Sequence, residues 1–341
     1  MIQNQELNKY LLDEYGDVVY DISSSQDEKT KKIIKFYYDM TQGHVDDFNK
    51  LVEPKMKKQF YFCIIDDDTF NAYATRYNDY DIVGVNFGTI SQIHSYFWKA
   101  LESGIFPEIE DSEARTDLHM FLSMTALNYI IFHEIAHNFH GHNDYECNTK
   151  ANFIFDMFFR KNNKIYQEQL DYKTLEMDAD AFAVNKSIRP LISQLATLSN
   201  DTLKNIIKEP IDLLKYWLFS VHSFFLFFQK EIVNPNTMVF ELYFPRRARQ
   251  AINIGVARDI IENEHPSYLE NFDCLTNEII PFAERIFTKI FPKSKIDELE
   301  IKSLKNTKFS KHVKEVFGNW NSLHDKLIPF SRLPLPPKNN Y

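Results

Sequence analysis

Five consecutive residues, His133-Glu134-Ile135-Ala136-His137, combine residue types and a spacing that suit metal-assisted hydrolysis. Two histidines four residues apart lie on the same face of an α-helix, so both imidazoles can bind one metal ion. A glutamate next to the first histidine can polarise a water molecule at that metal. The pattern therefore predicts a zinc hydrolase site, with His133 and His137 as ligands and Glu134 as the general base.

The residues before this motif predict a helix that is buried within a domain. Asp117 is the expected N-cap, and residues 118–132 are apolar on nearly all sides. The helix continues through the motif and is expected to end at Gly141, because glycine readily adopts the left-handed conformation of a C-cap. Burial is costly for histidine and glutamate unless they are paired or bind a metal. The alternative is a pair of core histidines that are hydrogen-bonded to the backbone.

A catalytic zinc site needs a third protein ligand, and the residues just after the motif supply it poorly. The extended metzincin pattern fails, because it needs glycine where His140 stands and histidine where Asn143 stands. His140 is near the same helix face as His133. However, at about 1.5 Å of rise per residue it lies about 10 Å further along the axis, which strains a shared tetrahedral site.

A better third ligand lies in the segment Leu175–Ala183, which contains Glu176 and Asp180 on one helical face. Glu176 is expected to bind the metal, while Asp180 accepts a hydrogen bond from the distal nitrogen of a ligating histidine. The alternative for this pair is an acidic, solvated helix face, since Glu168 and Asp171 precede it.

These motifs together resemble those of a known family of zinc peptidases. A HExxH helix followed by a helix with Glu-x-x-Ala-Asp resembles the gluzincin metallopeptidases of the HtpX/CAAX-protease and ImmA-like groups. The run HEIAHNFHGH at 133–142 most resembles the phage-exclusion Lit-type peptidases. Residues 70–74 and 80–88 resemble the paired strands that precede the active-site helix in these families. Residues 243–249 resemble a His-Pro-containing segment that ends in arginine, although Tyr243 stands where relatives often have histidine.

The resemblance covers roughly residues 60 to 250 and implies a zinc metalloendopeptidase that holds one Zn²⁺ per chain. It implies a specific intracellular protein substrate and a role in phage exclusion or defence. Lit-type relatives cut a host translation factor, and ImmA-like relatives cut a repressor. No obvious helix-turn-helix module is present, which disfavours a DNA-binding regulator. Residues 71–74 would let the substrate add as a β-strand.

The resemblance also suggests which side chains stabilise the oxyanion, and the candidates are Tyr243, Arg249 and Arg247. Removing one such donor typically costs about 3 kcal/mol of transition-state stabilisation. The alternative for the arginines is a surface cluster at the start of a helix.

Two other classes of function fit the same residues. One is a catalytically inactive interaction protein in which zinc is a structural clip, with His140 or His142 as a fourth ligand. That reading leaves Glu134 without a purpose. The other is a metal-dependent hydrolase of a non-peptide bond, because an activated water molecule does not choose its carbonyl group.

Composition limits the partners and the compartment. A net charge of -9 argues against a general nucleic-acid binder. Three widely spaced cysteines imply no disulfide framework and favour a cytoplasmic location. The N-terminus lacks the features of a signal peptide. The most apolar stretch, 216–228, is shorter than the ~20 residues that a membrane span requires, so we expect a buried helix there and no membrane segment.

The predicted fold class is α+β and mainly helical. It has a minimal gluzincin core, made of a small sheet, the active-site helix and the helix with Glu176, with extra helices at both ends. The predicted regions are an N-terminal helical region at 1–58, a zinc metallopeptidase core at 59–262, and a C-terminal helical region with a Pro-rich tail at 263–341. Strands are expected at 60–66, 70–76 and 81–87, and helices at 27–40, 45–58, 90–102, 165–187, 211–232 and 246–261.

Overall fold

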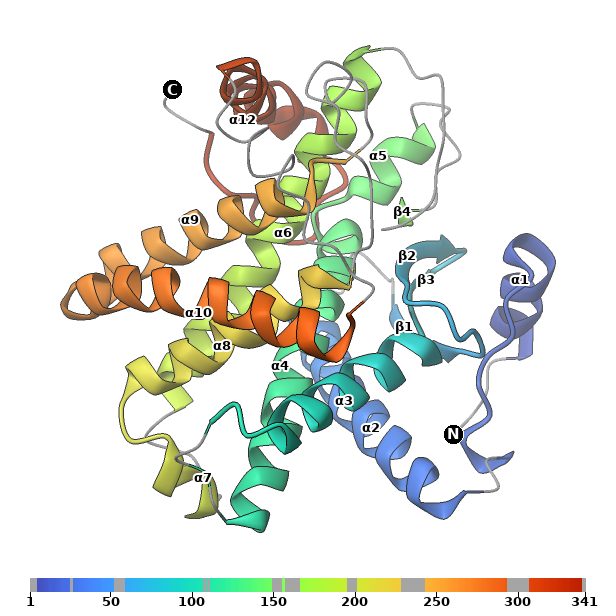
Figure 1. Ribbon diagram of the computed structural model, residues 1–341. Helices are drawn as coiled ribbons and strands as arrows, with labels where there is room; N and C mark the ends of the chain where they lie inside the picture. Colours follow the sequence, from blue (N-terminus) through green and yellow to red (C-terminus); the bar gives the residue numbers. More distant parts are fainter. Residues whose placement is uncertain are drawn as a thin grey trace. The chain divides into compact units, whose positions relative to one another are not determined.

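The computed structural model describes residues 5–24, 27–51, 59–106, 109, 111–148, 155–156, 166–194, 201–227, 243–292 and 307–338 (Figure 1). The fold is α+β and mainly helical, as predicted from the sequence. The chain divides into two compact units, each made of segments that are distant in sequence. The first contains Met1–Gln92, His133–Lys161 and Leu323–Lys338, and the second contains Ile93–Phe132, Asn162–Ser322 and Asn339–Tyr341.

Helices make up most of the described chain. In chain order they are α1 Gln5–Tyr15, α2 Glu28–Leu51, α3 Phe87–Glu102, α4 Ser112–Phe139, α5 His142–Asn148, α6 Tyr166–Gln194, α7 Asp201–Ile206, α8 Pro210–Leu226, α9 Arg246–Glu264, α10 Leu269–Ile290 and α12 Thr307–Leu327. The strands are β1 Gln59–Ile65, β2 Ala72–Tyr77, β3 Tyr80–Asn86 and β4 Phe155–Asp156. The described residues also include the short 3-10 helices η1 Ile22–Ser24 and η5 Pro266–Tyr268.

The sheet of the first unit has the strand order β1-β3-β2-β4. β1 runs parallel to β3, whereas β2 is antiparallel to both β3 and β4. The tight turn between β2 and β3 contains Asn78 at φ 51, a conformation that asparagine tolerates better than most residues. The three strands predicted from the sequence are confirmed, and each boundary moves by no more than two residues.

Helices α1 and α2 pack onto this sheet. Leu7 and Leu11 of α1 join a buried cluster with side chains from all three main strands. Asn49 of α2 accepts a hydrogen bond from the Phe60 backbone N–H of β1 (2.8 Å), which fixes the helix beside the strand. The predicted helices at 27–40 and 45–58 are one continuous helix up to Leu51, and residues 52–58 lie outside the described residues.

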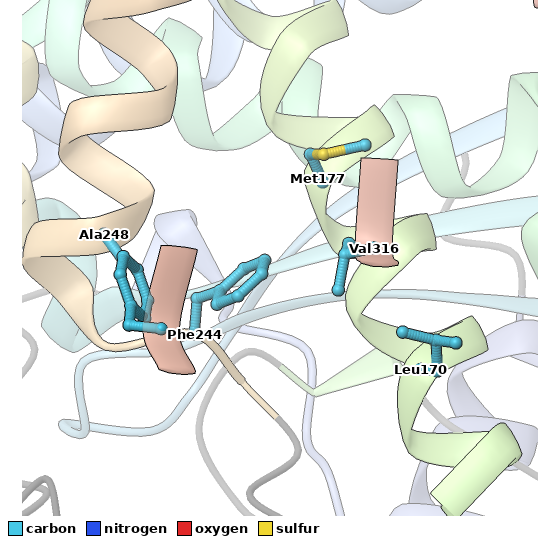
Figure 2. Packing of buried hydrophobic residues seen from close by; sticks show 6 residues of the cluster. Leu170, Met177, Phe244, Ala248 and Val316 are labelled. Carbon is cyan, nitrogen blue, oxygen red and sulfur yellow. The ribbon is translucent and has the colours of Figure 1, made fainter. Parts of the chain in front are cut away.

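The second unit is built around α8, which is buried along most of its length. Contacts join α8 to α6, α9 and α10, and Figure 1 shows α8, α9 and α10 side by side in yellow and orange. A second apolar cluster holds α6 against α9 and α12 (Figure 2). Its buried members are Leu170, Met177, Phe244, Ala248, Phe309 and Val316. This packing fixes the helix that carries Glu176.

Within the described part of the chain, no helix has both the length and the apolar character needed to cross a lipid bilayer. The apolar stretch that begins at Tyr216 is the buried core of α8, as expected, and its predicted continuation to 232 falls outside the described residues after Phe227.

Candidate metal centre

The two motif histidines lie on α4, which begins earlier than predicted. The helix starts at Ser112 because the Asp111 carboxylate caps it, accepting a hydrogen bond from the Ala114 N–H (2.8 Å). The prediction of Asp117 as the N-cap is therefore wrong, and Asp117 lies inside the helix. The predicted end is confirmed, because Gly141 follows the helix with φ +77.

His133, Glu134 and His137 are all buried, with exposed fractions of 0%, 0% and 1%. The helical spacing brings the Nε2 atoms of His133 and His137 to 3.1 Å from each other. Two nitrogen ligands of one tetrahedral zinc ion, each about 2.0–2.1 Å from the metal, stand about 3.3 Å apart. The two imidazoles therefore face one point at nearly the separation that a shared zinc ion requires.

A buried carboxylate completes this group. His133, His137 and Glu176 each offer a ligand atom, and these atoms all lie within 4.8 Å of one another. Two imidazole nitrogens and one carboxylate oxygen form a donor set that suits Zn²⁺, with a fourth position left for water. The described residues therefore include a buried group that could hold a metal ion, and its chemistry fits zinc.

Asp180 lies one helical turn after Glu176 on α6 and is the centre of a buried hydrogen-bond network. Its carboxylate accepts hydrogen bonds from Arg249 Nε (2.8 Å) and Nη2 (2.7 Å) and from the Tyr129 hydroxyl (2.9 Å). Asn253 in turn donates to the Tyr129 oxygen (2.8 Å). The predicted hydrogen bond between Asp180 and a ligating histidine stays a prediction.

The electrostatics keep this network in one protonation state. Burial alone would lower the pKa of Arg249, but the attraction of Asp180, with a smaller contribution from Glu176, raises it above its usual value. Burial raises the pKa of Tyr129 well above its usual value, and the nearby Asp180 charge adds to this effect. Arg249 is thus a permanent cation and Tyr129 a permanent donor beside the metal-ligand helix.

Arg249 also approaches the predicted metal ligand. Its Nη2 lies 3.5 Å from Glu176 Oε2, so the Arg249 guanidinium group forms ion pairs with both Glu176 and Asp180 of α6. These contacts bind α9 to α6 and hold Glu176 in place. The predicted role of Arg249 at an oxyanion remains a prediction.

The other two oxyanion candidates have different partners. The Tyr243 hydroxyl is 2.6 Å from the Tyr172 hydroxyl, and Arg247 forms an ion pair with Glu284 of α10 (2.7 Å). The side chains of Arg247 and Arg249 are only 12% and 7% exposed, so they are not a solvated surface cluster.

The C-terminal segment after α12 fastens the end of the motif helix, which the sequence did not indicate. Arg332 donates from its backbone N–H to the Phe139 carbonyl (2.8 Å) and from its guanidinium to both carboxylate oxygens of Asp81. The Phe139 ring also stacks on Phe60 of β1, with centroids 4.6 Å apart. These contacts fix the helix end where His137 lies.

A second buried group with metal-ligand chemistry follows the motif. His140, His142 and Asp178 each offer a ligand atom within 4.8 Å of the others. His142 also contacts the first group, because its Nδ1 lies 3.0 Å from Nδ1 of His137. The sequence suggested His140 as a strained third ligand, and His140 or His142 as a fourth zinc ligand. No spacing pattern in the sequence joins Asp178 to them.

No protein-family model matches the chain, and no curated protein or solved structure is significantly similar to it. The family resemblance therefore rests on the motifs alone.

Proposed function

We propose that this protein is a zinc-dependent peptidase, with the metal held by His133, His137 and Glu176. The observation that carries the proposal is the 3.1 Å separation of two buried imidazole Nε2 atoms, with the buried Glu134 next to the first of them in sequence. Two core histidines could share a proton at this distance. That simpler arrangement gives no reason to bury Glu134 and to place Glu176 in the same group.

In peptide hydrolysis, the residues of the chain would have the following roles. A zinc ion held by these residues would supply Lewis acidity and would lower the pKa of a water molecule to about 7. Glu134 takes a proton from the attacking water and delivers it to the leaving amine. Arg249 holds Glu176 and Asp180 in place, so the ligand does not have to reorganise during the reaction. Tyr243, Arg249 or both would donate to the developing oxyanion.

The substrate class and biological setting are proposals that rest on the motif resemblance. A protein substrate cut at a specific site, such as a translation factor during phage infection, agrees with the Lit-like run at 133–142. A cytoplasmic location agrees with the free cysteines Cys63, Cys147 and Cys274. The net charge of -9 agrees with a protein substrate better than with nucleic acid.

Peptide cleavage can be tested without knowing the substrate. The zinc-loaded chain is incubated with a peptide mixture from a digested bacterial proteome, and new peptide termini are identified by mass spectrometry. The wild type and Glu113→Gln should produce new termini, whereas Glu134→Gln should produce almost none. Glu113 is a matched control because it is an exposed glutamate in the first turn of the same helix. A Glu134→Gln protein that cleaves as well as the wild type would contradict the proposed mechanism.

A further inference from the structure

His137 and His142 meet through the Nδ1 atoms of their rings. These two atoms are 3.0 Å apart, and both side chains are buried, with exposed fractions of 1% and 0%. For a hydrogen bond at this distance, one of the two nitrogens must carry the proton and the other must accept it. The position of this one proton decides the chemistry of both rings.

The proposed metal centre determines where the proton lies. A neutral imidazole that binds a metal through Nε2 must carry its proton on Nδ1. His137 is therefore the donor, and His142 accepts through its own Nδ1. The proton of a neutral His142 must then lie on Nε2. Neither nitrogen of His142 retains a lone pair for a metal ion.

We infer that His142 is a positioning residue that fixes the tautomer and ring orientation of His137, and that it cannot bind a metal while His137 does so. The inference rests on the proposed zinc centre. The second buried group, which consists of His140, His142 and Asp178, also has metal-ligand chemistry. It cannot bind a metal through neutral imidazoles while the first group does so, because His142 then has no lone pair to offer. The chain would hold one zinc ion.

The local structure keeps His142 in this place. The chain turns sharply between α4 and α5 at Gly141, where an added Cβ would lie 2.5 Å from the Phe330 Cβ. The Asn143 amide donates to the Asn138 side-chain oxygen (2.6 Å), which ties the first turn of α5 back to α4. The two histidine rings consequently stay 5.1 Å apart between centroids, at an interplanar angle of 70°.

A pair of substitutions separates hydrogen bonding from shape. His142→Leu removes the acceptor, whereas His142→Asn places an amide oxygen close to where Nδ1 stood. Zinc affinity is measured by competition with a chromophoric chelator, and zinc content by elemental analysis. We expect the wild type to bind one zinc per chain. The zinc affinity should be about 10–100-fold weaker in His142→Leu, and within a few-fold of the wild-type affinity in His142→Asn. His140→Leu should keep the wild-type zinc content.

A measurement on the unaltered protein covers the case in which a variant fails to fold. ¹⁵N NMR of histidine-labelled, zinc-loaded wild type should show a protonated Nδ1 on His137 and a protonated Nε2 on His142. The inference is overturned by the opposite protonation pattern, by wild-type affinity in His142→Leu, or by two zinc ions per chain of which one is lost in His140→Leu. A wild type that binds no zinc would overturn the proposed function as well, so the two failures are distinguishable.

Discussion

Arg332, in the segment that follows α12, forms a buried bidentate ion pair with Asp81 of β3. The exposed fractions of these side chains are 1% and 0%, and Arg76 lies beside them, with its Nη2 3.0 Å from the same carboxylate. The C-terminal segment is thereby tied to the sheet and, through the Arg332 backbone N–H, to the last turn of the motif helix. The end of the chain thus takes part in holding the histidine-bearing helix.

Breaking this pair should destabilise the protein strongly. Arg332→Met leaves the fully buried Asp81 with less compensation, and loss of one partner of a buried ion pair typically costs about 3–5 kcal/mol. Urea unfolding followed by circular dichroism would measure the free energy of unfolding. Lys338→Met is the matched control, because Lys338 lies in the same segment as Arg332 and forms an exposed ion pair with Asp325 of α12. Its loss should change the free energy of unfolding little. Equal effects of the two substitutions would contradict the anchoring role of Arg332.

Gly141 should tolerate no larger residue. Its φ of +77 and the close approach of Phe330 both exclude a Cβ atom, so Gly141→Ala should lower the free energy of unfolding by at least about 1–2 kcal/mol. Gly43 provides the opposite case, since an added Cβ meets nothing within 4 Å in the middle of α2. Gly43→Ala should stabilise the protein by about 0.4–1 kcal/mol. Denaturant titrations of both variants check the pair, and a neutral Gly141→Ala would refute the described turn.

The hydrogen bond from Tyr129 to Asp180 should support the metal-ligand helix. Tyr129→Phe leaves Asp180 with one donor fewer and should cost about 1–3 kcal/mol of stability. It should also weaken zinc binding, because Arg249 is shared between Asp180 and Glu176. Tyr96→Phe is a control, since the Tyr96 hydroxyl pairs with Ser223 on a different helix pair. If the zinc affinity of Tyr129→Phe is unchanged, the hydrogen-bond network contributes to stability but not to metal binding.

Most residues of the candidate site could be named from the sequence because their spacing is local. His133, Glu134 and His137 are related by helical spacing alone, and the apolar run before them predicted their burial. Glu176 and Asp180 could be named because a four-residue spacing on a second helix places both on one face. Short-range periodicity was enough for these residues.

The remaining contacts join residues that are far apart in sequence, and no local pattern encodes them. Arg332 meets Asp81 across 251 positions, and the pairing depends on how the C-terminal segment lies on the sheet. Tyr129 looked like one more apolar residue in a buried helix, yet its hydroxyl reaches Asp180. The helix start at Asp111 was missed because Asp117 is an equally good capping residue when tertiary context is ignored.

Stability should fall as the pH is lowered through the ordinary histidine range. Burial lowers the pKa of His119, His222 and His312 below 6.5, although Glu284 beside His222 and Glu315 beside His312 partly oppose this. The unfolded chain then binds protons first as the pH falls. The contribution of these groups is therefore fully present above about pH 6.5 and is lost as the pH drops towards their folded-state pKa values.

Denaturant unfolding at about pH 8 and about pH 5.5 would measure this loss. His119→Gln should show a smaller loss than the wild type. It removes one titrating group and keeps an amide that can donate to the His94 carbonyl, to which His119 now bonds at 2.8 Å. A free energy of unfolding that rises as the pH falls from about 8 to about 5.5 would contradict this prediction.

The most direct test of the metal centre is the zinc content of the purified protein, measured by elemental analysis in the wild type, Glu134→Gln, Glu176→Ala and Glu168→Ala. Glu168 is an exposed glutamate on the same helix as Glu176 and serves as its control. The proposed centre predicts one zinc per chain in the wild type, Glu134→Gln and Glu168→Ala, and much less in Glu176→Ala. Full zinc content in Glu176→Ala would contradict the ligand set of His133, His137 and Glu176.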